Sequence, residues 1–188
     1  RVISKAIRLS APAQINVPRD FWTKVIDIEL PQIVEFERPA GGKEAIADAA
    51  RMLSEASFPV ILSGAGVVIG EAIDECRALA ERLDAPVCNG YQHNDSFPSS
   101  HPLACGPLGY NGSKAAMELI AQADVVLALG TRLNPFSTLP GYGIDYWPKD
   151  AQIIQVDINP DRIGLTKKVK VGICGDAAQV ATQIVTQL

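Results

Sequence analysis

Both histidines of this chain lie in one long polar stretch, GYQHNDSFPSSHPLACGPLGYNG, at residues 90–112. The imidazole of His93 could exchange a proton near neutral pH, and the neighbouring Asn94 and Asp95 could orient a substrate. Long loops rich in glycine and polar groups are commonly functional. We therefore take His93 and Asn94 as candidate catalytic residues, with a purely structural loop as the alternative. His101 is expected to fix the loop, and no metal-ligand cluster is predicted.

A second group of candidates follows an apolar segment, PVIL at residues 59–62, which runs into SGAG at residues 63–66. Glycines let the backbone turn sharply and leave its N–H groups uncovered. If a helix starts near Glu71, these groups could bind a phosphate or a carboxylate. The alternative is a tight turn without a ligand. The sequence lacks G-x-G-x-x-G, so the usual NAD fingerprint is absent.

Two charged residues follow other predicted strands. Arg132 comes shortly after DVVLAL at residues 124–129, where its guanidinium could bind a phosphate or form a salt bridge that caps the sheet. Asp157 closes IIQVD at residues 153–157, where its carboxylate could bind a ribose hydroxyl or cap the following turn. The sequence leaves both pairs of alternatives open.

Alternating strands and helices must position these residues. Such alternation requires right-handed crossovers and predicts an α/β fold with a doubly wound, mostly parallel Rossmann-like sheet and helices on both faces. Ligands in such sheets bind beyond the carboxyl ends of the strands, so residues 64–66, 130–132 and 157–159 should share one edge. We predict strands at 60–62, 86–88, 124–129, 153–157 and 169–173, and helices at 44–56, 71–83 and 177–188, the last with Asp176 as its N-cap.

The residues before this domain have a different character. Residues 3–9 are weakly helical in pattern, and AQINVP at residues 13–18 alternates as a short strand would. Residues 23–42 contain Pro31, a second proline and a Gly-Gly pair, a composition typical of a linker. We therefore expect the main domain to span residues 43–188.

Aromatic side chains gather in a second long loop, NPFSTLPGYGIDYWP, at residues 134–148. They could pack over a cofactor, against the loop's own sheet or against a neighbouring domain. We favour contact with a neighbouring domain.

Composition excludes several functions. The chain has 188 residues, a formal net charge of −4 and no Lys/Arg cluster, which argues against a nucleic-acid surface. No apolar run reaches the roughly 20 residues that span a bilayer. The four cysteines are irregularly spaced without C-x-x-C, which predicts no zinc site or redox pair but buried free thiols in a reducing cytoplasm. Because the chain begins at Arg1, we expect it to be part of a longer protein.

Six motifs together carry a resemblance to a known family. In chain order, the six motifs are APAQINVPRD, PVILSGAGV, FPSSHPLACGPLGYNG, ADVVLALGTRL, IIQVDINPDRIG and ICGDA. On these motifs, the chain resembles the central domain of thiamine-diphosphate-dependent enzymes of the acetolactate synthase group. The resemblance covers essentially the whole chain. Within the group, GYQHNDSFP and NPFSTLPGYGIDYWPKD look most like the acyltransferase branch that converts sulfoacetaldehyde and phosphate to acetyl phosphate and sulfite.

The resemblance implies that most of the chemistry belongs to other domains of the same protein. Residues 1–22 resemble the C-terminal remnant of a pyrimidine-binding domain, and a pyrophosphate-binding domain would follow. These flanking domains would bind most of the thiamine diphosphate and Mg²⁺, so the isolated chain is expected to be inactive. Gly175-Asp176-Ala177 is not the family's magnesium motif. The complete protein is expected to be a cytoplasmic homo-oligomer without nucleic-acid or membrane partners.

In relatives, the central domain binds FAD, or an ADP or CoA moiety, at its ligand edge. Two departures make FAD unlikely here: Tyr110-Asn111 replaces the family's Met-His pair, and Leu133-Asn134-Pro135 replaces its acidic-basic sequence. We expect a vestigial nucleotide edge without FAD. Carried over from the family, this edge comprises Gly64, Gly66, Gly109, Gly112, Gly130, Arg132, Asp157, Ile158 and Asp176.

Three rival functions remain open at this point. The chain could be a self-standing module that binds FAD or ADP, or the central domain of an acetolactate synthase-like enzyme or acyl-CoA lyase. It could also be a structural spacer between two catalytic domains.

Overall fold

The structure is a computed structural model that describes residues 1–30, 32 and 36–188. It divides into two units, Arg1–Arg38 and Pro39–Leu188, and each is described by itself. Pro31, on which the linker prediction partly rests, lies outside the described residues. In the part of the chain that the structure describes, no helix has the length and apolarity to cross a bilayer.

None of the described residues of the first unit is fully buried, so they form no core of their own. It contains helix α1 (Val2–Leu9), none of whose residues is buried, and the 3₁₀ turn η1 (Arg19–Phe21). The predicted strand at residues 13–18 is wrong, because the structure assigns no strand there. A single alternating segment is not stable as a strand without a partner to pair with. The apolar side chains of Phe21 and Trp22 are exposed.

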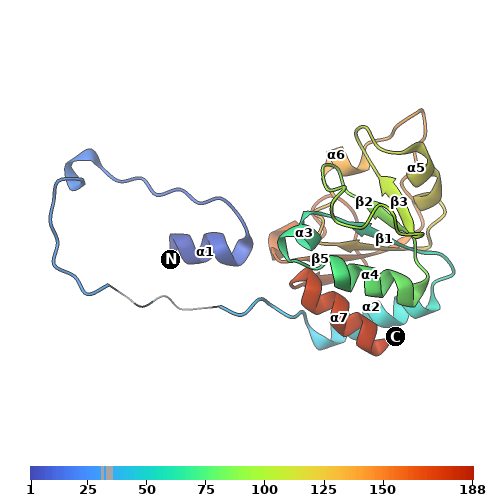
Figure 1. Ribbon diagram of the computed structural model, residues 1–188, viewed down its shortest axis with the longest axis horizontal. Coiled ribbons are helices and arrows are strands. Elements are labelled where there is room, and N and C mark those ends of the chain that lie inside the picture. The colour runs from blue at the N-terminus through green and yellow to red at the C-terminus, as the bar shows by residue number, and fades with distance from the viewer. Residues whose placement is uncertain (31, 33–35) are drawn as a thin grey trace. The chain divides into compact units, whose positions relative to one another are not determined.

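The second unit is built on one six-stranded sheet in which every strand is parallel to its neighbours, in the order β3-β2-β1-β4-β5-β6 (Figure 1). The order reverses between β1 and β4, which is the switch point of a doubly wound sheet. The predicted fold class is therefore confirmed. The strands are β1 (Pro59–Ser63), β2 (Val87–Asn89), β3 (Ala104–Pro107), β4 (Val125–Leu129), β5 (Gln152–Asp157) and β6 (Val171–Cys174).

Helices cover the two faces of the sheet unequally. Figure 1 shows α2, α4 and α7 packed together on one face of the sheet. On the other face, residues of α5 and the buried Tyr146 belong to a second apolar cluster. The helices of this unit are α2 (Lys43–Glu55), α3 (Ala65–Ile69), α4 (Ile73–Leu83), α5 (Lys114–Ile120), α6 (Pro135–Thr138) and α7 (Ala177–Gln187).

Strand β4 shows why the sequence forms a parallel core. Val125, Leu127 and Leu129 belong to the cluster under α2, α4 and α7. Val126 and Ala128 belong to the cluster on the opposite face. A strand buried on both faces must be apolar at every position, and VVLAL meets this demand.

Four sequence-based expectations need correction. The helix predicted to start at Glu71 starts at Ile73, because Glu71 has a φ of 55° in the left-handed region, and the short α3 precedes it. The loop at residues 90–112 contains β3, an edge strand in which proline is tolerated. The loop at residues 134–148 contains α6, capped by Asn134, whose side chain accepts a hydrogen bond from Ser137 N. Of the four thiols predicted to be buried, Cys174 is exposed and Cys105 is only partly buried.

Candidate functional site

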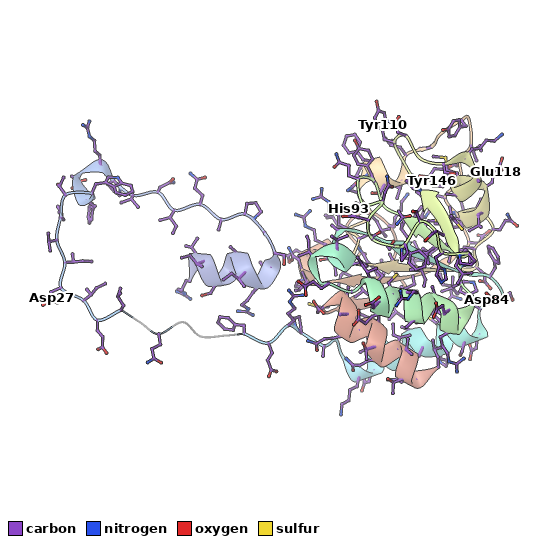
Figure 2. The ribbon with its side chains drawn as sticks, in the orientation of Figure 1. Asp27, Asp84, His93, Tyr110, Glu118 and Tyr146 are labelled. Carbon is purple, nitrogen blue, oxygen red and sulfur yellow. The ribbon has the colours of Figure 1, made fainter. Side chains whose placement is uncertain are left out.

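The predicted site residues all follow carboxyl ends of strands and therefore share one edge of the sheet. Neighbouring strands lie about 4.8 Å apart, so the edge from β3 to β6 spans about 24 Å and is too long for one small ligand. In Figure 2, His93 and Tyr110 lie across the unit from Asp84, which ends α4 beside the amino ends of the strands. His93 and Asn94 follow β2, Gly109 and Gly112 follow β3, Gly64 and Gly66 follow β1, Gly130 and Arg132 follow β4, Asp157 and Ile158 lie at the end of β5, and Asp176 follows β6.

The glycines at the switch point pack against each other. Gly64 N donates a hydrogen bond to Leu129 O at 3.1 Å, and Gly66 N donates one to Gly130 O at 2.8 Å. A Cβ on Gly66 would lie 2.6 Å from Gly130 Cα, and one on Gly130, whose φ is +61°, would lie 2.7 Å from Gly66 Cα. The missing side chains thus allow contact between the two turns, and both N–H groups already have acceptors in the chain.

A second close approach joins the segment after β3 to α6. A Cβ on Gly109, whose φ is +77°, would lie 1.9 Å from Phe136 O, and Tyr110 N donates a hydrogen bond to that oxygen at 2.8 Å. A Cβ on Gly112 would lie 2.8 Å from Pro107 O. Backbone packing alone, without a ligand, therefore explains why these two positions are glycine.

Asp157 caps the turn that follows β5. Its Oδ1 accepts a hydrogen bond from Asn159 N at 2.8 Å, which is the capping alternative left open by the sequence. Partial burial raises the pKa of Asp157, although this hydrogen bond and the charges of Arg162 and Arg132 oppose the rise. Arg132 itself is exposed, and no ion pair to it is present among the described residues.

Asp176 is the N-cap of α7, as predicted. Its Oδ1 accepts hydrogen bonds from Ala178 N at 3.2 Å and Gln179 N at 3.3 Å. Its own N–H donates to Pro39 O at 2.7 Å. The side chain is buried and satisfies the start of a helix that packs against the sheet.

The turn that carries His93 rests on a buried polar cluster that the sequence analysis missed. Ser63 Oγ and Ser96 Oγ lie 2.7 Å apart, and Asn89 Nδ2 donates to Ser96 Oγ at 2.9 Å. The carbonyl of His93 accepts hydrogen bonds from Ser96 Oγ at 2.7 Å and from Asn89 Nδ2 at 3.3 Å. The backbone of His93 is therefore fixed, while its side chain is half-buried and that of Asn94 is exposed. The sequence pattern that could have revealed this cluster is a polar residue at the end of each of two apolar strands, Ser63 in β1 and Asn89 in β2.

His101 has a structural role, as expected. Its Nε2 lies 3.1 Å from Glu81 Oε1, and its Nδ1 accepts a hydrogen bond from Leu103 N at 3.2 Å. Its ring also meets the edge of Phe97, with 5.1 Å between ring centroids. Both ring nitrogens are occupied, and this histidine holds its loop against α4.

An exposed aromatic group lies beside the His93 turn. Tyr91 stacks on Phe136 with 5.7 Å between ring centroids and meets the edge of Tyr110 at 6.0 Å. Tyr110 and Phe136 are each more than half exposed. This surface is available to a ligand or to another domain.

Tyr146 anchors the second aromatic loop to its own sheet. The side chain is buried, and its hydroxyl accepts a hydrogen bond from Gly109 N at 3.1 Å. Burial raises the pKa of Tyr146 to about 12, so the hydroxyl keeps its proton at neutral pH. The loop at residues 134–148 is thus pinned at Tyr146, while Phe136 and Tyr142 remain exposed.

The chain belongs to a family described as "Thiamine pyrophosphate enzyme, central domain", which it matches over residues 46–184. It is 81% identical over all 188 residues to a probable sulfoacetaldehyde acetyltransferase of Rhizobium meliloti and 74% identical to a sulfoacetaldehyde acetyltransferase of Roseovarius nubinhibens. The chain spans about a third of these relatives, 32% and 31% of their lengths.

A more distant relative and a solved structure are also similar to this chain. A probable acetolactate synthase large subunit of Methanocaldococcus jannaschii is 36% identical over 94% of this chain, which covers 31% of that protein. The crystal structure of benzoylformate decarboxylase from Polynucleobacter necessarius superposes with a TM-score of 0.75 and 21% identity, covering 91% of this chain and 32% of that one. The latter likeness concerns the fold alone.

The residues of this chain do not by themselves fit thiamine diphosphate with a divalent cation. Within the described ranges, no group of three or more His, Cys, Asp or Glu side chains is placed to hold a metal ion. The N–H groups of Gly64 and Gly66, which could have met a diphosphate, donate to backbone carbonyls. We derive no catalytic step through the cofactor from these residues.

Proposed function

We propose that this chain is the central domain of a sulfoacetaldehyde acetyltransferase, an acyltransferase that converts sulfoacetaldehyde and phosphate to acetyl phosphate and sulfite. The observation that carries the proposal is the identity of 81% and 74% over the whole chain to two proteins of that name. The 36% identity to a probable acetolactate synthase makes that activity the second candidate.

The proposed role of the chain is architectural. Its carboxyl edge is filled by the chain's own backbone at the contact of Gly64 and Gly66 with Gly130, and at the contact of Gly109 with Phe136. These contacts support a vestigial nucleotide edge that holds neither FAD nor ADP. The remaining assigned residues would stabilise turns and helix ends along the same edge. They are Arg132, Asp157, Ile158, Gly112 and Asp176.

The cofactor would be bound by other domains of the complete protein. We assign residues 1–22 to the end of a pyrimidine-binding domain, residues 23–42 to a linker and residues 43–188 to the central domain. The exposed apolar side chains of Phe21 and Trp22 support the first assignment, because neither is buried within its own unit. Thiamine diphosphate and Mg²⁺ would then lie mainly in the flanking domains of a cytoplasmic homo-oligomer.

His93 and Asn94 are proposed to face the substrate entrance. The rigid turn beneath His93 supports this role, because a fixed backbone positions a half-buried side chain without further ordering. In the full-length enzyme, His93→Ala should raise the KM for substrate or lower kcat by about tenfold, or about 1.4 kcal/mol. His101→Ala is the matched control and should lower only stability. Unchanged kcat and KM in His93→Ala would remove the assignment.

The function itself is tested with the full-length protein. Supplied with thiamine diphosphate, Mg²⁺, sulfoacetaldehyde and phosphate, it should form acetyl phosphate and sulfite, and residues 1–188 alone should form neither. Acetolactate formation from pyruvate, without acetyl phosphate formation from sulfoacetaldehyde, would establish the second candidate and overturn the first.

A further inference from the structure

Two cysteines meet where β2 and β3 pair. Val87 pairs with Ala104, but Cys88 pairs with Gly106, so Cys105 is an extra residue in the register. In a β-bulge, two residues of one strand stand opposite one residue of the other. Cys88 and Cys105 both belong to the apolar cluster on the α5 face of the sheet. The bulge thus brings a second thiol to the face on which Cys88 is buried.

The register places the two thiols side by side, and they are unequal. The neighbouring Cys88 thiol lowers the pKa of Cys105 to about 7, against a smaller opposing effect of burial. The Cys105 thiol, together with burial, raises the pKa of Cys88. The Cys88 thiol also donates a weak hydrogen bond to Ala116 O at 3.9 Å. Cys105 is half-buried on the edge strand β3, whereas Cys88 is fully buried beneath it.

The other two cysteines lack these features. Cys76 is fully buried in α4, and burial raises its pKa to about 12. Cys174 is exposed, but partial burial and the charge of Asp157 raise its pKa. Only a thiolate is an efficient nucleophile, so accessibility and acidity coincide at Cys105 among the four thiols.

We propose that Cys105 and Cys88 form a peroxide-sensitive thiol pair, in which Cys105 is the site of attack and Cys88 the resolving thiol. The Cys105 thiolate attacks one oxygen of hydrogen peroxide, the O–O bond breaks, and a sulfenic acid and hydroxide form. The sulfur of Cys88 then attacks the sulfur of Cys105, the S–O bond breaks, and water leaves. In sum, two thiols and one peroxide give one disulfide and two waters.

The disulfide would join β2 to β3 and close the loop that carries His93. That loop is held in the reduced protein by the Ser63, Asn89 and Ser96 cluster and by the edge pairing of β3. Oxidation adds a covalent tie across this pairing.

The test uses the full-length protein treated with equimolar hydrogen peroxide and digested under thiol-blocking conditions. Mass spectrometry should find a Cys88–Cys105 linked peptide that is two hydrogens lighter than the reduced pair and is restored by dithiothreitol. In Cys88→Ser, the sulfenic acid should persist and be trapped by dimedone at Cys105. Cys76→Ser and Cys174→Ser are the matched controls and should leave the link intact. Overoxidation of Cys105 without a link, or a link through another cysteine, would overturn the proposal.

A measurement on the unmutated protein guards against a variant that fails to fold. At pH 7, about half of Cys105 should be thiolate, whereas Cys174, whose pKa is raised, should be thiolate to a far smaller extent; the lower nucleophilicity of the more acidic thiol offsets part of this advantage. Iodoacetamide should therefore alkylate Cys105 about tenfold faster than Cys174. Equal rates, or faster alkylation of Cys174, would show that Cys105 is not the reactive thiol.

Discussion

The contact between Gly66 and Gly130 can be tested by adding a single methyl group. In Gly130→Ala, the new Cβ would meet Gly66 Cα at 2.7 Å and Val67 N at 2.8 Å, and both are backbone atoms of α3, which cannot give way as the end of a flexible side chain could. Gly143→Ala is the matched control, because Gly143 also has a positive φ, +73°, but a Cβ there meets nothing within 4 Å. The two variants share the backbone strain and differ in the overlap.

The expected magnitudes follow from these two effects. An alanine in the left-handed region costs about 1–2 kcal/mol, which is all that Gly143→Ala should lose. Overlap in a packed region adds about 1–3 kcal/mol to Gly130→Ala. For a chain of this size, a difference of about 2 kcal/mol lowers Tm by about 4–8 °C. Thermal unfolding followed by circular dichroism would measure it. Equal losses in the two variants would refute a close backbone contact at the switch point.

Other substitutions test the buried polar groups and the strand ends. Ser96→Ala leaves the buried amide of Asn89 without its closest acceptor and should cost about 1–3 kcal/mol in urea unfolding, whereas Ser99→Ala, on the exposed part of the same loop, should cost little. Tyr146→Phe removes the acceptor of a buried backbone N–H and should cost about 1–3 kcal/mol by the same assay, with no change between pH 7 and pH 9 because the hydroxyl stays protonated. At Asp124, burial is the largest single effect and raises the pKa, but hydrogen bonds from several backbone N–H groups together outweigh it and lower the pKa, so Asp124→Asn should reduce stability at pH 7. Burial raises the pKa of Asp157, so Asp157→Asn should increase stability at pH 7. The loss in Asp124→Asn should fade as the pH falls from the unfolded-state pKa through the lowered folded-state pKa, and the gain in Asp157→Asn should fade as the pH falls through the raised folded-state pKa to the unfolded-state pKa; Tm measured as the pH is lowered from 7 should show opposite signs for the two variants.

The fold was predictable because its strands are buried on both faces. The apolar runs VVLAL in β4 and IIQVD in β5 are explained by burial on both faces of the sheet. Asp176 was predictable as the N-cap of α7 because it directly precedes the apolar pattern of that helix. The short elements were not predictable. The four residues of β3 include glycine and proline, and they form a strand because β2 offers a pairing edge, which is a tertiary effect.

The edge of the sheet was predicted, but the function of its glycines was not determined by the sequence. A glycine that exposes an N–H to a ligand and a glycine that allows two backbones to touch look identical in sequence. The distances around Gly66 and Gly109 distinguish these cases, because the space is taken by residues far along the chain. The Cys88–Cys105 contact was missed for the same reason, since a β-bulge creates it.

The claim that this chain closes its own ligand edge is tested most directly by nucleotide binding to the purified full-length protein. The contacts of Gly64, Gly66 and Gly109 predict that no flavin absorbance near 450 nm accompanies the protein and that calorimetric titration with FAD or ADP gives no binding heat. Copurified FAD, or saturable binding of ADP that Arg132→Ala abolishes, would contradict it.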